Sequence, residues 1–236
     1  MQHVKISYIK FLAPFAFVVY NDFFVWMVEK YMETYGLFIY WKQWHKGSPE
    51  WFDHRIDYYQ WPRSLNPHWV ERGIYSKEVM FKSCRVLDIA CGDGFYPKYF
   101  YVSTGAIIDA IDLNPGAIAH ARKYNANKNI RYFLQNALTQ PFPQKKYDVI
   151  CLDGVIDHFN QKQLDQLLVK IRKSLTNKGI ITGYQEISNT ILGVEHQIFF
   201  PTIAKLRETF HKHFTHVTIK IINSSGRINA YLHCSN

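Results

Sequence analysis

The sequence predicts an α/β fold, in which helices cover both faces of a seven-stranded, mostly parallel sheet with one antiparallel strand near the C-terminal end. From Cys84 onward, short apolar runs typical of buried strands alternate with amphipathic runs typical of helices. Such alternation indicates parallel strands joined by crossover helices. The last two apolar runs are separated only by residues 223–226, which is too short for a crossover, so one strand of that pair should run antiparallel.

Each predicted strand is an apolar run bounded by turn residues. In chain order the strands are Arg85–Ala90, Ala106–Ile111, Ile130–Leu134, Tyr147–Leu152, Gly179–Ile187, Val217–Ile222 and Ile228–His233. The predicted helices between them are Phe95–Val102, Pro115–Tyr124, Gln161–Ser174 and Pro201–Phe214. We expect Asn177-Lys178-Gly179 to close the third helix, because glycine is common just beyond a helix end.

Residues 1–80 differ in composition from residues 81–236, and we predict that they form a helical, aromatic extension, or lid, on the main domain. The uncharged stretch Phe11–Asn21 is shorter than the roughly 20 apolar residues that cross a bilayer. No small-x-small cleavage site follows it, so a signal peptide is not expected. An amphipathic helix remains, which either packs on the body of the protein or lies on a membrane surface through residues 1–40.

The amino-acid composition is typical of a globular protein with a hydrophobic core. Of its 236 residues, 47% are hydrophobic and 20% charged, which excludes disorder over most of the chain. The four cysteines form no CxxC pair and no zinc pattern, so a disulfide scaffold is not expected and a reducing, cytoplasmic location is favoured. The net charge of +9 suits an anionic partner without choosing among phosphate, nucleic acid and anionic membrane.

The segment from Val86 to Gly94, VLDIACGDG, runs from a strand through small residues into a helix. In an open parallel sheet, ligands bind beyond the carboxyl ends of the strands. The third small residue of a dinucleotide motif is missing because Phe95 stands there, and Asp88 would repel a pyrophosphate. A carboxylate at this place favours a cationic ligand such as S-adenosylmethionine instead.

Asp112 ends the second predicted strand, where an acid accepts hydrogen bonds from the two hydroxyls of a ribose. Its alternative role is that of a helix N-cap ahead of Pro115, for which Asn114 is better placed. Asp88 and Asp112 on consecutive strands are stronger evidence for a cofactor site than either residue alone.

Four segments together resemble class I S-adenosylmethionine-dependent methyltransferases, which have a Rossmann-like fold. The resemblance extends from Phe81 to the C-terminus and rests on VLDIACGDG (86–94), AIDLNP (110–115), Asn136-Ala137 and YDVICLDGVIDHF (147–159). It implies S-adenosylmethionine as cofactor and S-adenosylhomocysteine as product. In addition, residues 52–76 are similar to a stretch that precedes this domain in bacterial methyltransferases of surface-polysaccharide and O-antigen biosynthesis.

The resemblance also implies residue roles. Around the methionine part it places Asp88, Ala90, Gly92 and Gly94, and around the ribose and adenine Asp112, Leu113, Asn136 and Ala137. The predicted cofactor-binding set also contains Tyr59, Arg63, Cys91, Phe95 and Leu152. Two residues depart from the family: Ala90 replaces a frequent glycine, which is tolerable if its φ is negative, and Asn136 replaces a frequent Asp while still able to accept from the adenine amino group.

His158 is the predicted general base, because an imidazole titrates near working pH. Asp157 orients it or Asp153 acts alone, whereas the alternative is that His158 only lines the pocket. Arg63, with Arg72 in reserve, would hold the methionine carboxylate, and Tyr58 and Tyr59 would lie over the cofactor or simply pack in the core.

Metal ligands are not expected. Five polar residues that could in principle assemble a magnesium-type site are better explained as pocket lining, because they are widely separated in the sequence. These residues are Asp153, His158, Glu186, Glu195 and His196.

The predicted function is methylation of a sugar, glycan or other small-molecule hydroxyl. RNA methylation is the alternative, favoured by charge and aromatic content, but LDGVID (152–157) differs from the N/D-P-P-Y/F of enzymes that methylate exocyclic base amines, and nucleic acid is not the expected partner. A non-catalytic S-adenosylmethionine-binding module is a second alternative, and an oxidoreductase is disfavoured by the glycine segment. The sequence does not indicate an oligomeric state.

Overall fold

The structure is a computed structural model that describes residues 23, 26–27, 30–31, 68–191, 196–224 and 226–236. The chain divides into two compact units, residues 1–46 and 47–236, and the sheet and the pocket described below belong to the second. Most of the predicted N-terminal helix lies outside the described residues, although residues 23, 26–27 and 30–31 are described and helical. The predicted lid residues Tyr58, Tyr59 and Arg63 lie outside the described residues, as does Glu195. Within the described part of the chain, we find no helix of the length and apolar character that a membrane crossing requires.

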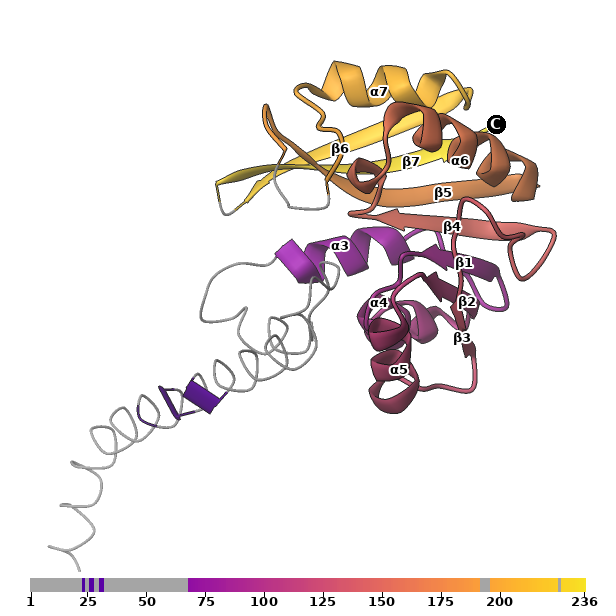
Figure 1. Cartoon of the computed structure of the whole chain (residues 1–236), viewed down its shortest axis with the longest axis vertical. Coiled ribbons are helices and arrows are strands. Elements are labelled where there is room, and N and C mark those ends of the chain that lie inside the picture. The colour runs from indigo at the N-terminus through magenta and orange to yellow at the C-terminus, as the bar shows by residue number, and fades with distance from the viewer. Residues whose placement is uncertain (1–22, 24–25, 28–29, 32–67, 192–195, 225) are drawn as a thin grey trace, which may run out of the picture. The chain divides into compact units, whose positions relative to one another are not determined.

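Seven strands form one sheet in the order β3-β2-β1-β4-β5-β7-β6 (Figure 1). In chain order they are β1 (Arg85–Ile89), β2 (Ile107–Asp112), β3 (Ile130–Leu134), β4 (Tyr147–Asp153), β5 (Leu175–Ile187), β6 (His216–Ser224) and β7 (Arg227–Ser235). Neighbours from β3 to β5 pair in parallel, whereas β7 pairs antiparallel with both β5 and β6. The predicted fold class is therefore confirmed.

The chain leaves β1 toward β2 and β3 and then returns to place β4 on the other side of β1. This reversal makes the carboxyl ends of β1 and β4 a topological switch point, where the connections diverge and leave a crevice. The fold therefore places the ligand crevice where the sequence predicts it.

Helices cover both faces of the sheet. They are α3 (His68–Lys77), α4 (Phe95–Tyr99), α5 (Pro115–Tyr124), α6 (Gln161–Ser174) and α7 (Ile203–His211), with short 3-10 turns η1 (Tyr101–Thr104) and η2 (Ile156–His158). Leu87 and Ile89 of β1 join the core under α6 and α7, and Val86, which precedes Leu87, joins the core under α4 and α5 on the opposite face. This alternation is expected of a strand buried on both sides.

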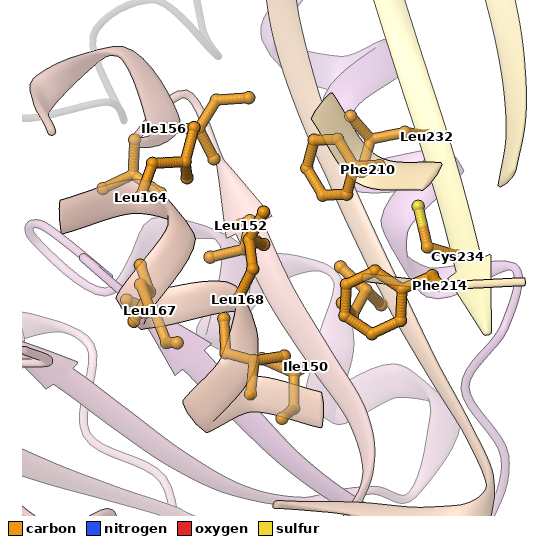
Figure 2. Close-up of a cluster of buried hydrophobic side chains, with 14 of the residues drawn as sticks. Ile150, Leu152, Ile156, Leu164, Leu167, Leu168, Phe210, Phe214, Leu232 and Cys234 are labelled. Atoms are coloured by element: carbon orange, nitrogen blue, oxygen red, sulfur yellow. The ribbon is translucent and has the colours of Figure 1, made fainter. Parts of the chain in front are cut away.

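The core under α6 and α7 is the larger of the two. Figure 2 shows Leu164, Leu167 and Leu168 of α6 beside Ile150 and Leu152 of β4. These five side chains are at most 1% exposed. Since burying one leucine fully contributes about 1.5–3 kcal/mol, the apolar stripe predicted for residues 161–174 accounts for how this helix is held on the sheet.

Two sequence predictions are wrong at the ends of elements. The helix predicted over Phe95–Val102 ends at Tyr99 and continues as η1. Gly179 does not close α6, which ends at Ser174, because Leu175 is extended, buried and already paired with Tyr147 as the first residue of β5. By contrast, Asn114 caps α5 as predicted, accepting from the backbone N–H groups of Gly116 and Ala117.

Candidate functional site

A pocket of about 880 Å³ opens beyond the carboxyl ends of β1, β2, β4 and β5. Its volume is within the range of sites that bury a cofactor-sized ligand. The structure brings together here eleven of the predicted site residues: Asp88, Ala90, Cys91, Gly92, Asp112, Leu113, Asn136, Ala137, Asp153, Asp157 and His158.

Gly94, Phe95 and Leu152 do not line this pocket. Phe95 and Leu152 are each 1% exposed and pack in the two cores. Gly94 has φ +78, and a Cβ on it would lie 2.5 Å from Tyr132 Oη, so its glycine is required for packing. These three residues support the turn through packing and do not face the pocket.

The turn after β1 uses the left-handed backbone region three times. Ala90, Gly92 and Gly94 have φ values of +60, +54 and +78. The condition under which Ala90 would be tolerated without strain, a negative φ, is not met, because the chain turns there at the end of the strand with φ +60. A Cβ on Gly92 would meet no atom within 4 Å, so this side of the turn is open space in which a ligand can approach the backbone.

Asp88 lies below this turn and is 2% exposed. Its Oδ2 atom is buried without a hydrogen-bond partner. Burial, followed by the nearby carboxylates of Asp153 and Asp112, raises the pKa of Asp88 well above its ordinary value. A cationic ligand relieves this repulsion and a pyrophosphate adds to it, so the residues present fit S-adenosylmethionine better than a dinucleotide.

Asp112 is held by the backbone on both carboxylate oxygens. Oδ2 accepts from the Gly92 N–H at 2.9 Å and Oδ1 from the Asn114 N–H at 2.8 Å. Burial raises the pKa of Asp112, and these two hydrogen bonds oppose that rise. Each oxygen has a second lone pair, so a carboxylate fixed in this way can still accept from a ribose diol. The neighbouring Leu113 lines the pocket and is 65% exposed, which provides an apolar surface for a flat ring.

Asn136 is oriented differently from the sequence prediction. Its Oδ1 accepts from the backbone N–H groups of Leu138, at 2.8 Å, and Thr139, at 3.3 Å. With both lone pairs of the oxygen directed at the backbone, the amide offers a ligand its NH₂ group, a donor. In this orientation Asn136 suits an acceptor nitrogen of a purine rather than its amino group.

Asp153 is paired with Arg72 of α3. The Arg72 Nη2 and Nε atoms donate to Asp153 Oδ2 at 2.7 and 3.0 Å. The guanidinium also lies over the rings of Trp69, at 4.5 Å, and Tyr184, at 4.4 Å. Burial lowers the pKa of Arg72, but the Asp153 carboxylate, together with Tyr96 and Tyr184, raises it by more, so the pKa of Arg72 lies above its ordinary value. An aspartate tied to a permanent cation is a poor proton acceptor, so Asp153 does not fit the role of a base acting alone.

Asp157 and His158 lie in η2, directly after β4. Asp157 Oδ2 accepts from Gln185 Nε2 at 2.9 Å and lies 3.5 Å from His196 Nδ1. The His158 and His196 rings pack edge to face, with centroids 4.6 Å apart. The carboxylate predicted to orient His158 thus also faces a second histidine, which sequence reasoning had assigned only to pocket lining.

Sequence reasoning missed several residues that line the pocket: Trp69, Tyr96, Tyr184, Gln185 and Arg227. Trp69 and Arg72 are three residues apart in α3, a spacing that places them on one helix face. This spacing could have predicted that Trp69 lies beside Arg72. The other four residues come from segments whose approach to the pocket depends on tertiary packing.

Comparison with known proteins identifies the kind of domain that carries this pocket. Residues 86–179 match the family model described as a methyltransferase domain. N-terminal Xaa-Pro-Lys N-methyltransferase 2 of Danio rerio is 30% identical over 40% of this chain and 36% of that protein. Aklanonic acid methyltransferase DauC of Streptomyces sp. strain C5 is 35% identical over 28% of this chain and 32% of that protein. The chain thus matches about a third of the length of these relatives. The match supports a methyltransferase domain in this part of the chain.

Solved structures show the fold in proteins of different chemistry. The S-adenosylmethionine-dependent methyltransferase SibL aligns with a TM-score of 0.60 at 16% identity over 77% of this chain and 57% of that chain. The [4+2]-cyclase SpnF aligns with a TM-score of 0.57 at 14% identity over 69% and 79%. Since both enzymes have this fold, the reaction has to be argued from the site residues.

Proposed function

We propose that the chain is an S-adenosylmethionine-dependent methyltransferase that methylates a hydroxyl group of a glycan or another small molecule. The observation that carries the proposal is the pair of acids at the glycine turn. Asp88 presents an unpartnered, buried carboxyl oxygen, and Asp112 is fixed beside the open backbone of Gly92. This donor set suits a ligand with a cationic amino-acid part and a ribose.

The cofactor is S-adenosylmethionine, and S-adenosylhomocysteine is the product. When bound, the cofactor would supply a methyl group on a sulfonium sulfur, and the thioether product would leave as the acceptor bonds to the methyl carbon in line. Asp88 holds the cationic end, Asp112 the ribose, and Leu113, Asn136 and Ala137 the base. The chain's remaining task is to align the acceptor and to exclude water from the pocket.

A hydroxyl acceptor must lose its proton as the new bond forms. His158 lines the end of the pocket beyond β4 and is the residue we propose for this task. Asp153 is not assigned to it because of its ion pair with Arg72. In our proposal that pair is a positioning element for the pocket wall.

The glycan part of the proposal rests on the similarity of residues 52–76 to bacterial polysaccharide methyltransferases, a segment of which only residues 68–76 are described. We also propose that the protein is cytoplasmic and that residues 1–40 either pack on the body of the protein or contact the inner face of the membrane. Acceptor screens therefore begin with nucleotide sugars and lipid-linked glycans, and RNA serves as the competing acceptor.

Calorimetric titration of the full chain with S-adenosylmethionine, S-adenosylhomocysteine and NADH tests the cofactor assignment. We expect the first two to bind and NADH not to bind. Asp88→Asn and Asp112→Asn should each weaken S-adenosylmethionine binding at least about tenfold, or about 1.4 kcal/mol, because each removes a charge while preserving shape. Glu208→Gln on the exposed face of α7 is the matched control. Unchanged affinity in both Asp variants, or tight NADH binding, contradicts the proposal.

A further inference from the structure

We propose that Asp157, His158 and His196 form a binding site for a divalent transition-metal ion at the acceptor end of the pocket. One ligand atom from each of the three residues lies within 4.8 Å of the others. All three residues line the pocket. Binding of the cation does not depend on the proposed function. Only the role of the cation toward the acceptor rests on it.

The distances suit coordination after a small closure of the side chains. Neighbouring ligands at about 2.1 Å from a metal ion are about 3–3.5 Å apart. His196 Nδ1 and Asp157 Oδ2 are already 3.5 Å apart. All separations lie within 4.8 Å, at most about 1.3 Å beyond this range, and rotation of an imidazole can supply the difference.

The carboxyl group of Asp157 gives the second, independent observation. The residue is 6% exposed, and its Oδ1 atom is buried without a hydrogen-bond partner. A buried carboxylate oxygen left in this way costs free energy, and Gln185 satisfies only the other oxygen. A cation bound by the Asp157 carboxylate and the two imidazoles would lower this cost by compensating the buried negative charge.

The backbone holds the two halves of the site together across a long sequence separation. The Asp157 carbonyl accepts from the backbone N–H of Gln197 at 2.7 Å. The Gln197 side chain in turn donates to the His158 carbonyl at 2.8 Å. These contacts fix the segment that carries His196 against η2, and Gln185 orients the carboxylate in the way that outer-sphere partners orient metal ligands.

The ligand set selects the class of cation. Magnesium and calcium prefer oxygen ligands, whereas two imidazoles and one carboxylate suit zinc, cobalt, manganese or iron(II). Three protein ligands leave coordination positions open toward the pocket, where an acceptor hydroxyl can be oriented and made more acidic. A nitrogen that binds a cation has no electron pair for a proton, so His158 would then promote proton loss through the cation.

Cobalt(II) is the probe, because its visible absorption reports nitrogen and oxygen ligation independently of enzyme activity. The full chain is freed of metal with a chelator, dialysed and titrated with cobalt(II), then with zinc(II) and magnesium(II) as competitors. We expect one equivalent to bind per chain, zinc to displace cobalt, and magnesium to displace it poorly. His196→Ala and the isosteric Asp157→Asn should each weaken cobalt binding at least tenfold, and His211→Ala on the exposed face of α7 should not.

Circular dichroism establishes that each variant is folded, and Asp157→Asn keeps the test valid if His196→Ala fails to fold. The proposal is overturned if the wild type binds no stoichiometric cobalt, or if binding persists unchanged in both variants. S-adenosylmethionine binding, measured on the same metal-free protein, separates the two proposals. Loss of cofactor binding with intact cobalt binding contradicts only the proposed function, and the reverse contradicts only the metal site.

Discussion

The backbone conformation of Ala90 could not be predicted from the type of residue. An L-residue other than glycine pays roughly 1–2 kcal/mol for the left-handed backbone region, because its Cβ approaches the next carbonyl oxygen. Ala90 nevertheless has φ +60 at the end of β1. The hydrogen bond from the Cys91 N–H to the Ile111 carbonyl, at 3.1 Å, ties the next residue to β2 and holds the turn in place.

Replacing Ala90 by glycine should therefore stabilise the protein. The relief of the left-handed strain exceeds the extra entropy that glycine brings to the unfolded chain, for a net gain of about 0.5–1 kcal/mol in the free energy of unfolding. Denaturant unfolding measures it. Ala119→Gly is the matched control, because Ala119 is exposed inside α5 and the same replacement there should destabilise by about 1 kcal/mol. A loss of stability in Ala90→Gly would show that the methyl group makes a contact that outweighs the strain.

At the scale of elements, α3 is fastened to the sheet at the pocket. Its Arg72 holds Asp153 at the end of β4, and its Tyr75 stacks on His233 of β7 with ring centroids 4.2 Å apart. The Arg72 and Asp153 side chains are 9% and 6% exposed. Removing one partner of so buried a pair leaves the other charge without compensation, so the pair decides whether α3 stays in place.

Arg72→Met should lower the free energy of unfolding by about 3 kcal/mol or more, since it leaves the Asp153 charge buried. The double variant Arg72→Met/Asp153→Leu should recover much of this loss, because it removes both charges and keeps similar volume. Lys205→Met, from the exposed Lys205–Glu208 pair of α7, should change stability by less than about 0.5 kcal/mol. Equal losses in the Arg72 and Lys205 variants in chemical denaturation contradict this account.

At the scale of the whole molecule, the sign of the net charge is opposite to the sign of the charges gathered in the pocket. The chain carries a net charge of +9, yet Asp88, Asp112 and Asp153 gather at the floor of the pocket. This arrangement keeps a cationic ligand inside a basic protein. It also links proton binding to ligand binding through Asp88, whose pKa is raised by burial and by the other two acids.

S-adenosylmethionine affinity should therefore rise with pH. Folded, ligand-free protein keeps the Asp88 proton to higher pH than the unfolded chain does, so Asp88 costs stability as pH rises through that window. The cationic ligand favours the carboxylate, lowers the pKa of Asp88 and releases a proton on binding. Calorimetry from about pH 5 to about pH 8, in buffers of different ionisation enthalpy, measures this release. It should be absent in Asp88→Asn, and a wild-type affinity that is flat across this range would contradict the linkage.

Most of the fold could be predicted from the sequence, because each strand is rich in apolar residues and the longer crossover helices have one apolar face. The beginning of β5 could not, since Thr176, Asn177 and Lys178 look like a turn but lie in a strand extension paired near Tyr147. The acids of the site could be predicted because they directly follow strands. His196 and Arg72 could not be assigned their partners, because His196 meets Asp157 and Arg72 meets Asp153 only through tertiary packing.

The position of β7 has a consequence for how the protein assembles. β6 comes first along the chain, but β7 lies between it and β5 and pairs with both. During synthesis, β6 therefore has no partner in the sheet until β7 has emerged, and β5 presents an open edge meanwhile. Because α7 and β6 separate β5 from β7 in the chain, this edge of the sheet closes only after the last strand has been made, and we expect this stage of folding to be the one most exposed to aggregation or proteolysis. A nascent chain interrupted before residue 227 would lack an interior strand, so quality control could recognise it by the unpaired β5 edge.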